Sequence, residues 1–155
     1  SAQKNLHYHP FSKERIVLIA GNNTDTSAVE NHINNKNYEA LKNELKNNLW
    51  YSTAADMEHL KHFWIENFKE HPDFKPNYIV PNISSIIRCL SDGNGFSIVP
   101  DFLCQEALNS GKIKHVWRGE IQLENTLYFG SRKNTIYEKE IEQLQQIFID
   151  KWCKD

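Results

Sequence analysis

The sequence feature that most constrains the fold is an uninterrupted apolar run at residues 16–20 (IVLIA), which Gly21 ends. Five consecutive apolar residues without polar alternation predict a β-strand that is covered on both faces. The run is rich in β-branched side chains, which favour extended backbone. The chain is therefore expected to build a sheet with helices on both sides, rather than a sheet with one face open to water.

The remaining apolar patterns alternate between helix and strand periods. Met57, Leu60, Trp64 and Phe68 are spaced by three, four and four residues, which predicts one apolar stripe on a helix. The predicted helices are residues 38–48, 56–70, 82–93, 101–111 and 137–152, and the predicted strands are 16–20, 49–52, 77–80, 96–99, 112–117 and 125–130. Residues 22–37 are polar and rich in asparagine, so they are expected to form a loop. This order predicts an α/β fold, a mixed sheet covered by helices.

Length and charge narrow the class of protein. The 155 residues are 39% hydrophobic with four tryptophans, enough for the core of about one domain. A net charge of -2 disfavours a chain that coats nucleic acid or an anionic membrane. Apolar runs stay well below the about 20 residues of a membrane span, and the sequence shows no signal peptide. The chain begins at Ser1 and its only methionine is Met57, so we expect a processed or partial chain.

The three cysteines indicate a reducing compartment. Cys89, Cys104 and Cys153 form an odd set with no C-x-x-C pair, which is typical of the free thiols of an intracellular, cytoplasmic protein. Cys89 and Cys104 lie on apolar faces of predicted helices, and we interpret both as core residues. No disulfide is expected.

The segment DGNGFS contains a G-x-G pattern in the wrong order for a dinucleotide site. A phosphate-binding loop follows a strand and opens a helix, whereas Gly93 and Gly95 end a predicted helix and open a strand. We therefore predict structural roles for both glycines. Gly93 is expected to take a positive φ at the helix end, and Gly95 to permit a close approach at the start of the following strand.

The sequence offers no catalytic constellation and no metal site. There is no G-x-S-x-G elbow for a hydrolase nucleophile. His59 and His62 are three residues apart, a spacing that can share a metal, but no third ligand completes the set, so we place them on a solvated face. His7 and His9 are assigned to the surface for the same reason. The sequence thus predicts no cofactor and no enzyme, but a domain that binds a small molecule at its strand ends.

A family resemblance sharpens this picture. The stretch YIVPNISSIIRCLSDGNGFSIVPDFLCQEALNSGKI resembles the effector-binding domains of LysR-type transcriptional regulators, in which an apolar helix, a G-x-G turn, a short strand and a proline follow in this order. Gly93, Gly95, Pro100 and Gly111 occupy those places. HPFSKERIVLIAG, WYSTAADMEHLKHFWIENF and NTLYFGSRKN resemble further segments of the same domain. The resemblance covers nearly the whole chain.

The resemblance implies one subdomain of a two-lobed effector-binding domain of the periplasmic-binding-protein-like type 2 class. Residues 1–13 are then a crossing segment, 14–117 form subdomain two, and 118–155 are a strand and helix that belong to subdomain one. The family's winged helix-turn-helix, its linker helix and the first half of subdomain one have no counterpart here. Promoter DNA is therefore expected to bind only through segments outside this chain, and no membrane partner is expected.

The resemblance also suggests effector-binding residues. Ser52 and Thr53 open the loop after a strand, where hydroxyl and free N–H groups can hold a small anion, often a carboxylate in this family. Asn82 and Ser84 begin the next helix and are expected to act similarly, with Phe96 as an apolar wall. Each of the polar residues is alternatively an ordinary helix cap.

Two functions remain open at this point. The first is the effector-sensing domain of a LysR-type regulator, and the alternative is one lobe of an extracytoplasmic solute-binding protein. The first is favoured by the cysteines, whose number and spacing are typical of free thiols, and by the segments that resemble the LysR family. Residues 124–152 would pack into subdomain one in the family's fold. We therefore expect the chain to self-associate through this segment, or else to fold the segment back on its own body.

Overall fold

The computed structural model describes residues 6–132 and Ile147, with side chains from Lys13 to Glu124. It divides into two compact units. Arg15–Leu123 form the larger one, here called the main unit. The described part of the other unit comprises residues 6–14 and 124–132.

The sheet of the main unit is centred on β1 (Leu6–Gly21), whose last residues lie between two antiparallel neighbours. On one side is β4 (Phe96–Pro100), with Ile16 opposite Pro100. On the other side is β5 (Ile113–Trp117). The predicted strand at 16–20 is thus confirmed as the middle of the sheet, where both of its edges are paired.

Two short strands continue the sheet pattern beyond β4. β2 (Tyr51–Ser52) pairs in parallel with β3 (Tyr78–Ile79). Trp50 forms a parallel bridge with Phe96, whose N–H donates to the carbonyl of Leu49 at 2.8 Å. β2, β3 and β4 therefore run in the same direction, and their carboxyl ends meet at one edge.

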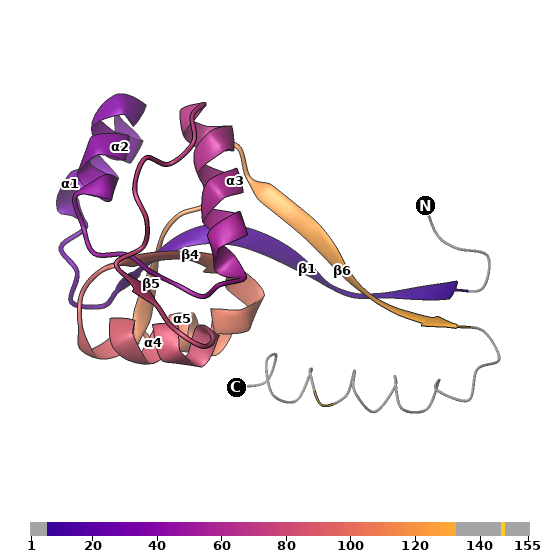
Figure 1. Cartoon of the computed structure of the whole chain (residues 1–155). Coiled ribbons are helices and arrows are strands. Elements are labelled where there is room, and N and C mark those ends of the chain that lie inside the picture. The colour runs from indigo at the N-terminus through magenta and orange to yellow at the C-terminus, as the bar shows by residue number, and fades with distance from the viewer. Residues whose placement is uncertain (1–5, 133–146, 148–155) are drawn as a thin grey trace. The chain divides into compact units, whose positions relative to one another are not determined.

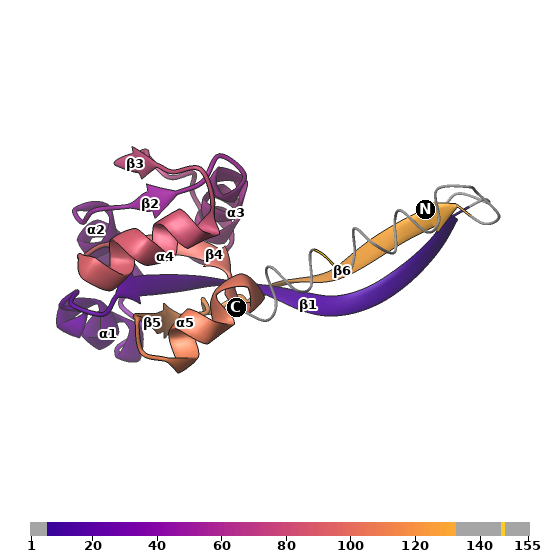
Figure 2. The same cartoon turned by 90° about the horizontal axis from the view of Figure 1, so that it is seen from below.

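Helices cover both faces of this sheet, as Figures 1 and 2 show. One face carries α1 (Ser27–Asn34), α2 (Tyr38–Lys46) and α3 (Asp56–Phe68). The other carries α4 (Ile83–Asp92), the 3₁₀ turn η1 (Asp101–Cys104) and α5 (Gln105–Asn109). The predicted mixed sheet between helices is confirmed.

The core follows from the alternation of side chains along β1. Ile16, Leu18 and Ala20 belong to a cluster of buried side chains, while Val17 and Ile19 point to the opposite face and are equally buried. The cluster is completed by side chains from α1 to α3 and from the neighbouring strands: Val29, Leu41, Leu45, Trp50, Leu60, Phe63, Trp64, Phe96, Ile98 and Trp117. The IVLIA run therefore supplies core residues to both layers of helices.

The loop prediction for residues 22–37 is wrong, because α1 forms within it. Only Val29 is fully buried on this helix, with Ile33 packed four residues later. The helix start is held by polar groups, since Asp25 accepts hydrogen bonds from the amide and the hydroxyl of Ser27 at 3.0 and 2.6 Å. Three apolar residues in sixteen, one of them Ala28, were too weak a periodic signal to outweigh the asparagine-rich composition.

Three further local predictions need correction. The helix expected over 101–111 is split into η1 and α5. Gly93 has φ -130°, which any residue adopts, and the positive φ of +133° lies at Gly95 instead. Met57, placed on the apolar stripe of α3, is 37% exposed, whereas Phe63 is fully buried. The close approach at Gly95 is confirmed, because a Cβ there would lie 3.0 Å from the carbonyl oxygen of Leu49.

The described part of the second unit is a pair of strands. β6 (Leu123–Arg132) pairs with β1, and Lys13 and Glu124 form an ion pair at 3.3 Å. Apart from Ile147, the helix predicted over 137–152 lies outside the described residues, as does Cys153. Among the described helices, none combines the length and the apolar character needed to cross a bilayer.

Candidate functional site

The carboxyl ends of β2, β3 and β4 form the place where a small molecule is expected to bind in an open α/β sheet. Each of these strands leads into a helix: β2 into α3, β3 into α4 and β4 into η1. We call this region the strand-end edge and define it by residues 52–56, 80–85 and 100–104. It contains four of the five residues predicted to contact an effector.

Ser52 and Thr53 lie at the end of β2 and are nearly inaccessible, at 3% and 7% exposure. The Ser52 hydroxyl donates to the carbonyl of Thr53 at 2.8 Å. The Thr53 hydroxyl donates to Asp56 Oδ2 at 2.7 Å and accepts from the Asp56 amide at 3.0 Å. Both hydroxyls are therefore already engaged, and Thr53 caps the first turn of α3.

Asp56 is the residue that the sequence interpretation undervalued at this edge. It is an acidic residue in the first turn of α3. Its other carboxylate oxygen lies 2.9 Å from Nδ1 of His59, so Thr53, Asp56 and His59 form one connected polar chain. The T-x-x-D spacing, which resembles a capping box, was the available sequence signal.

The start of α4 is more open than the start of α3. Asn82 Oδ1 accepts from the amide and the hydroxyl of Ser85 at 2.9 and 3.0 Å, which confirms the predicted cap. Ser84 is exposed, and the first turn carries no acidic residue. Helix geometry leaves the amides of Ile83 and Ser84 without an intrahelical acceptor. Donors for an anion are therefore concentrated here rather than at α3.

Phe96 lies apart from the other predicted residues. It begins β4, whereas Pro100 ends it, so Phe96 is at the opposite end of the strand from the strand-end edge. Its side chain is 0% exposed, and its ring lies 5.8 Å from that of Trp50 in the core. Whether these five residues contact a ligand stays a prediction.

Asp101 and Cys104 complete the strand-end edge on the β4 side. Asp101 accepts from the backbone amide of Arg15 at 3.3 Å, and the guanidinium lies 4.0 Å from its other oxygen. Cys104 is 1% exposed, and its thiol donates to the carbonyl of Asp101 at 3.4 Å. Burial raises the pKa of Cys104 to about 12, assisted by the negative charges of Asp101 and Asp56. The thiol is therefore neutral at physiological pH and is not an activated nucleophile.

The cysteine and histidine predictions have mixed outcomes. Cys104 is a core residue as expected, but Cys89 is only partly buried. His62 is exposed as expected, while His59 is partly buried by its contact with Asp56. Across the part of the chain that the structure describes, no three His, Cys, Asp or Glu side chains are arranged to hold a metal.

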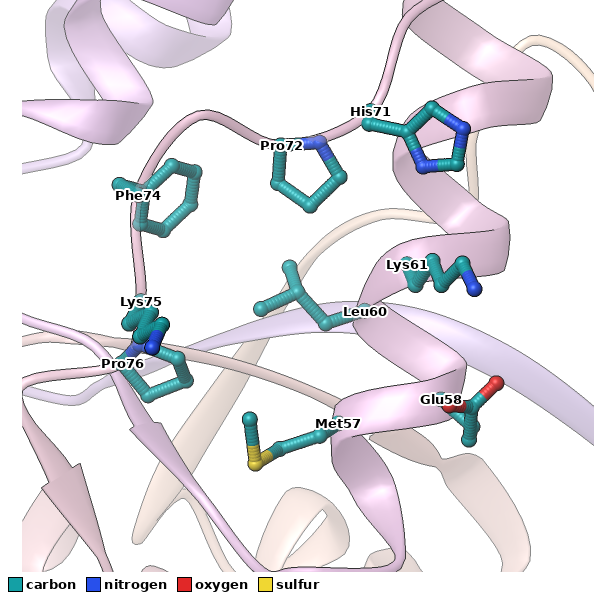
Figure 3. Close-up of a pocket in the computed structure, with 9 residues that line it drawn as sticks. All are labelled: Met57, Glu58, Leu60, Lys61, His71, Pro72, Phe74, Lys75 and Pro76. Carbon is teal, nitrogen blue, oxygen red and sulfur yellow. The ribbon is translucent and has the colours of Figure 1, made fainter.

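A separate surface pocket with a volume of about 230 Å³ lies between α3 and the segment that leads to β3 (Figure 3). We call it the α3 pocket. Its lining residues are Met57, Glu58, Leu60, Lys61, His71, Pro72, Phe74, Lys75 and Pro76. None of the residues predicted from the sequence to bind an effector lines it.

Comparison with known proteins gives a clear result only for structure. No protein-family model matches the chain, and no curated protein matches it in sequence. A solved LysR family transcriptional regulator matches with a TM-score of 0.58 at 13% identity, over 93% of this chain and 43% of that one. The effector-binding domain of QuiR in complex with shikimate matches with a TM-score of 0.57 at 13% identity, over 97% and 66%.

The bromide-bound regulatory domain of HypT from Salmonella typhimurium matches with a TM-score of 0.59 at 10% identity, over 96% of this chain and 65% of that one. The chain has the fold of part of a LysR-family regulatory domain. The resemblance inferred from the sequence is thus confirmed at the level of structure. This chain spans between 43% and 66% of these three solved chains.

Proposed function

We propose that this chain is the effector-sensing part of a LysR-type transcriptional regulator, cytoplasmic and without catalytic activity. The observation that carries the proposal is the fold shared with LysR regulatory domains over 93–97% of the chain. The strand-end edge supports it, because three parallel strands end there and three helical segments begin. Promoter DNA is read by segments outside this chain.

The proposed effector is a small anion, held at the strand-end edge. The QuiR structure contains shikimate, a carboxylate, and the HypT structure contains bromide. In this chain the start of α4 offers the exposed Ser84 hydroxyl and two amides at the positive end of the helix dipole. Asp56 places a negative charge at the start of α3, so the anionic group belongs nearer to Asn82 and Ser84. Ser52 and Thr53 then form the adjoining strand end.

The test is a titration of the chain with a panel of small carboxylates that includes shikimate, monitored by calorimetry. For a carboxylate that binds, we expect the pair Asn82→Ala and Ser84→Ala to weaken affinity by about tenfold, since charge-assisted hydrogen bonds contribute about 1.5–3 kcal/mol. The pair Ser52→Ala and Thr53→Ala is expected to have a smaller effect.

Ser110→Ala is the matched control, because this hydroxyl caps the end of α5. Unchanged affinity in both double variants would remove the strand-end edge from the binding site. If none of the carboxylates in the panel binds, the anion-sensing proposal itself fails.

Self-association through residues 124–152 is part of the same proposal. Light scattering over a concentration series is expected to show a rising average mass for the chain, and a version that ends at Gly119 is expected to remain monomeric. A full chain that stays monomeric at all concentrations would contradict this.

A further inference from the structure

The α3 pocket is an apolar cavity with a charged rim, well suited to a ligand that has one apolar and one anionic end. Figure 3 shows Met57 and Leu60 pointing from α3 toward Phe74 and the prolines of the facing segment. Four polar side chains also line the pocket. They are Glu58, Lys61, His71 and Lys75.

The wall that faces α3 is held in place before any ligand binds. The Phe74 ring lies 5.4 Å from that of Trp50 and 5.0 Å from that of Trp64, both of which are core residues. Asp73 forms an ion pair with Lys46 at 3.1 Å, which ties the segment to α2. Two prolines restrict the backbone further. A wall fixed in this way costs little ordering entropy when a ligand enters.

The end of this segment is fixed to β2 as well. Asn77 Oδ1 accepts a hydrogen bond from the amide of Trp50 at 2.7 Å. The opposite wall is α3 itself, where Leu60 is 4% exposed and belongs to the core cluster, while Met57 is 37% exposed. Methionine adapts its shape to different partners more readily than branched side chains. The pocket thus combines walls that are already held in place with one adaptable apolar side chain, that of Met57, which is partly exposed to solvent.

The charged residues at the rim of the pocket determine whether an anionic or a cationic ligand is favoured. Lys61 and Lys75 form no ion pair with any other residue for which the structure gives side chains, and Glu58 is the only carboxylate among the lining residues. Two ammonium groups against one carboxylate favour an anion. A strongly hydrated inorganic anion would gain nothing from the apolar floor, so the ligand must also carry an apolar body.

The volume limits the size of that body. About 230 Å³ lies below the roughly 300–1,000 Å³ of pockets for drug-sized ligands, so the cavity fits a single ring or a short branched chain. We propose that the α3 pocket is a second ligand site, separate from the strand-end edge, which binds small amphipathic carboxylates of the arylalkanoate type. Their ring lies against Leu60, Met57 and Phe74, and their carboxylate is paired with Lys61 or Lys75.

The chain contains a built-in reporter for this site, since Met57 is its only methionine. In a methyl-selective NMR spectrum of the full chain, the single Met57 methyl signal is followed while 3-phenylpropanoate is added. We expect a saturable shift, and binding about fivefold or more weaker for 3-phenylpropan-1-ol, which has the same ring without the charge. Absence of a shift, or equal affinity for acid and alcohol, would overturn the proposal.

Variants test the rim and separate this site from the proposed effector site. Lys61→Glu combined with Lys75→Glu is expected to weaken 3-phenylpropanoate binding by about tenfold. Lys112→Glu, an exposed lysine away from the pocket, should leave it unchanged. Asn82→Ala combined with Ser84→Ala, at the start of α4 and outside the pocket lining, should also leave the titration unchanged, so that failure of the effector proposal leaves this result intact. If Lys112→Glu weakens binding as much as the rim variant, the attraction is only net charge and the site assignment is wrong.

Discussion

The strand-end edge and the α3 pocket both include residues of helix α3, but their side chains differ in burial and in polarity. At the strand-end edge, the side chains of Ser52 and Thr53 are buried and hydrogen-bonded to the start of α3. In the α3 pocket, the side chain of Met57 is exposed one residue after Asp56, and the lysines of the rim have no ionic partner among the described side chains. The hydroxyl groups at the strand-end edge already have hydrogen-bond partners, whereas the α3 pocket is apolar and open to solvent.

This difference determines what a ligand must exchange in each place. A ligand that contacts Thr53 has to replace hydrogen bonds that already stabilise α3, so its net gain is small unless its geometry is good. A ligand in the α3 pocket displaces water from apolar surface and meets charges that are only solvated. Polar residues at strand ends are therefore a weaker sign of a binding site than their type suggests, until their partners are known.

The largest expected effect comes from a change at Gly95, directly before β4, where the backbone packs closely against Tyr51 of β2. Gly95→Ala places a Cβ 2.9 Å from the Tyr51 ring and 3.0 Å from the Leu49 carbonyl oxygen, at a φ of +133°. We expect the free energy of unfolding, measured with urea, to fall by roughly 3 kcal/mol, the sum of backbone strain and overpacking.

Gly111→Ala provides the matched control for that measurement. Its φ is also positive, at +77°, but no atom lies within 4 Å of the added Cβ. The expected loss is about 1–2 kcal/mol, from backbone conformation alone. Equal losses in the two variants would show that contact with β2 contributes nothing at Gly95.

The next effect is confined to the strand-end edge and depends on pH. The pKa of Cys104 is raised from 9.0 to about 12, so above pH 9 the unfolded chain loses a proton that the folded chain retains. The free energy of unfolding should then fall as pH rises, by up to about 1.4 kcal/mol per pH unit from this group. The measurement is urea unfolding at pH 8 and pH 10 for wild type and Cys104→Ala. If the variant loses as much stability as wild type over this interval, the thiol does not titrate as described.

A smaller expected effect on the free energy of unfolding distinguishes the strand-end edge from the α3 pocket. Thr53→Ala removes the cap of α3 and is expected to lower the free energy of unfolding by about 1 kcal/mol. Ser84→Ala and Lys61→Ala change exposed side chains that form no hydrogen bond or ion pair with the other described side chains, and each should stay within about 0.5 kcal/mol of wild type. Thermal unfolding of the three variants is sufficient. A loss at Lys61 equal to that at Thr53 would mean that the pocket rim is structural, like the edge.

Local patterns were enough to predict much of the main unit. The IVLIA run identified the central strand, because a strand paired on both sides and covered on both faces must be apolar throughout. Asn82 and the residues after it identified α4, because a side-chain cap acts within one turn. Helix α1 was not predicted, because a helix that contributes only Val29 and Ile33 to the core cluster has almost no apolar periodicity.

The candidate sites were harder to predict, for a different reason. Phe96 was placed near the effector because it follows a G-x-G turn, but the direction of β4 puts it at the far end of the strand. Strand direction depends on pairing between distant segments, which no short window contains. The α3 pocket depends in the same way on Phe74 packing against Trp50. In the sequence, residues 71–76 indicated only where a helix ends.

Strand β4 has a consequence for how this protein can change over evolutionary time. All five of its residues are buried, including Ser97 at 0% exposure, whose hydroxyl donates to the Tyr51 carbonyl at 2.7 Å. In a saturation mutagenesis library, we expect residues 96–100 to accept the fewest substitutions, since each alters volume in a closed layer. Remote relatives are then better recognised by the sequence of side-chain sizes along this strand than by overall identity.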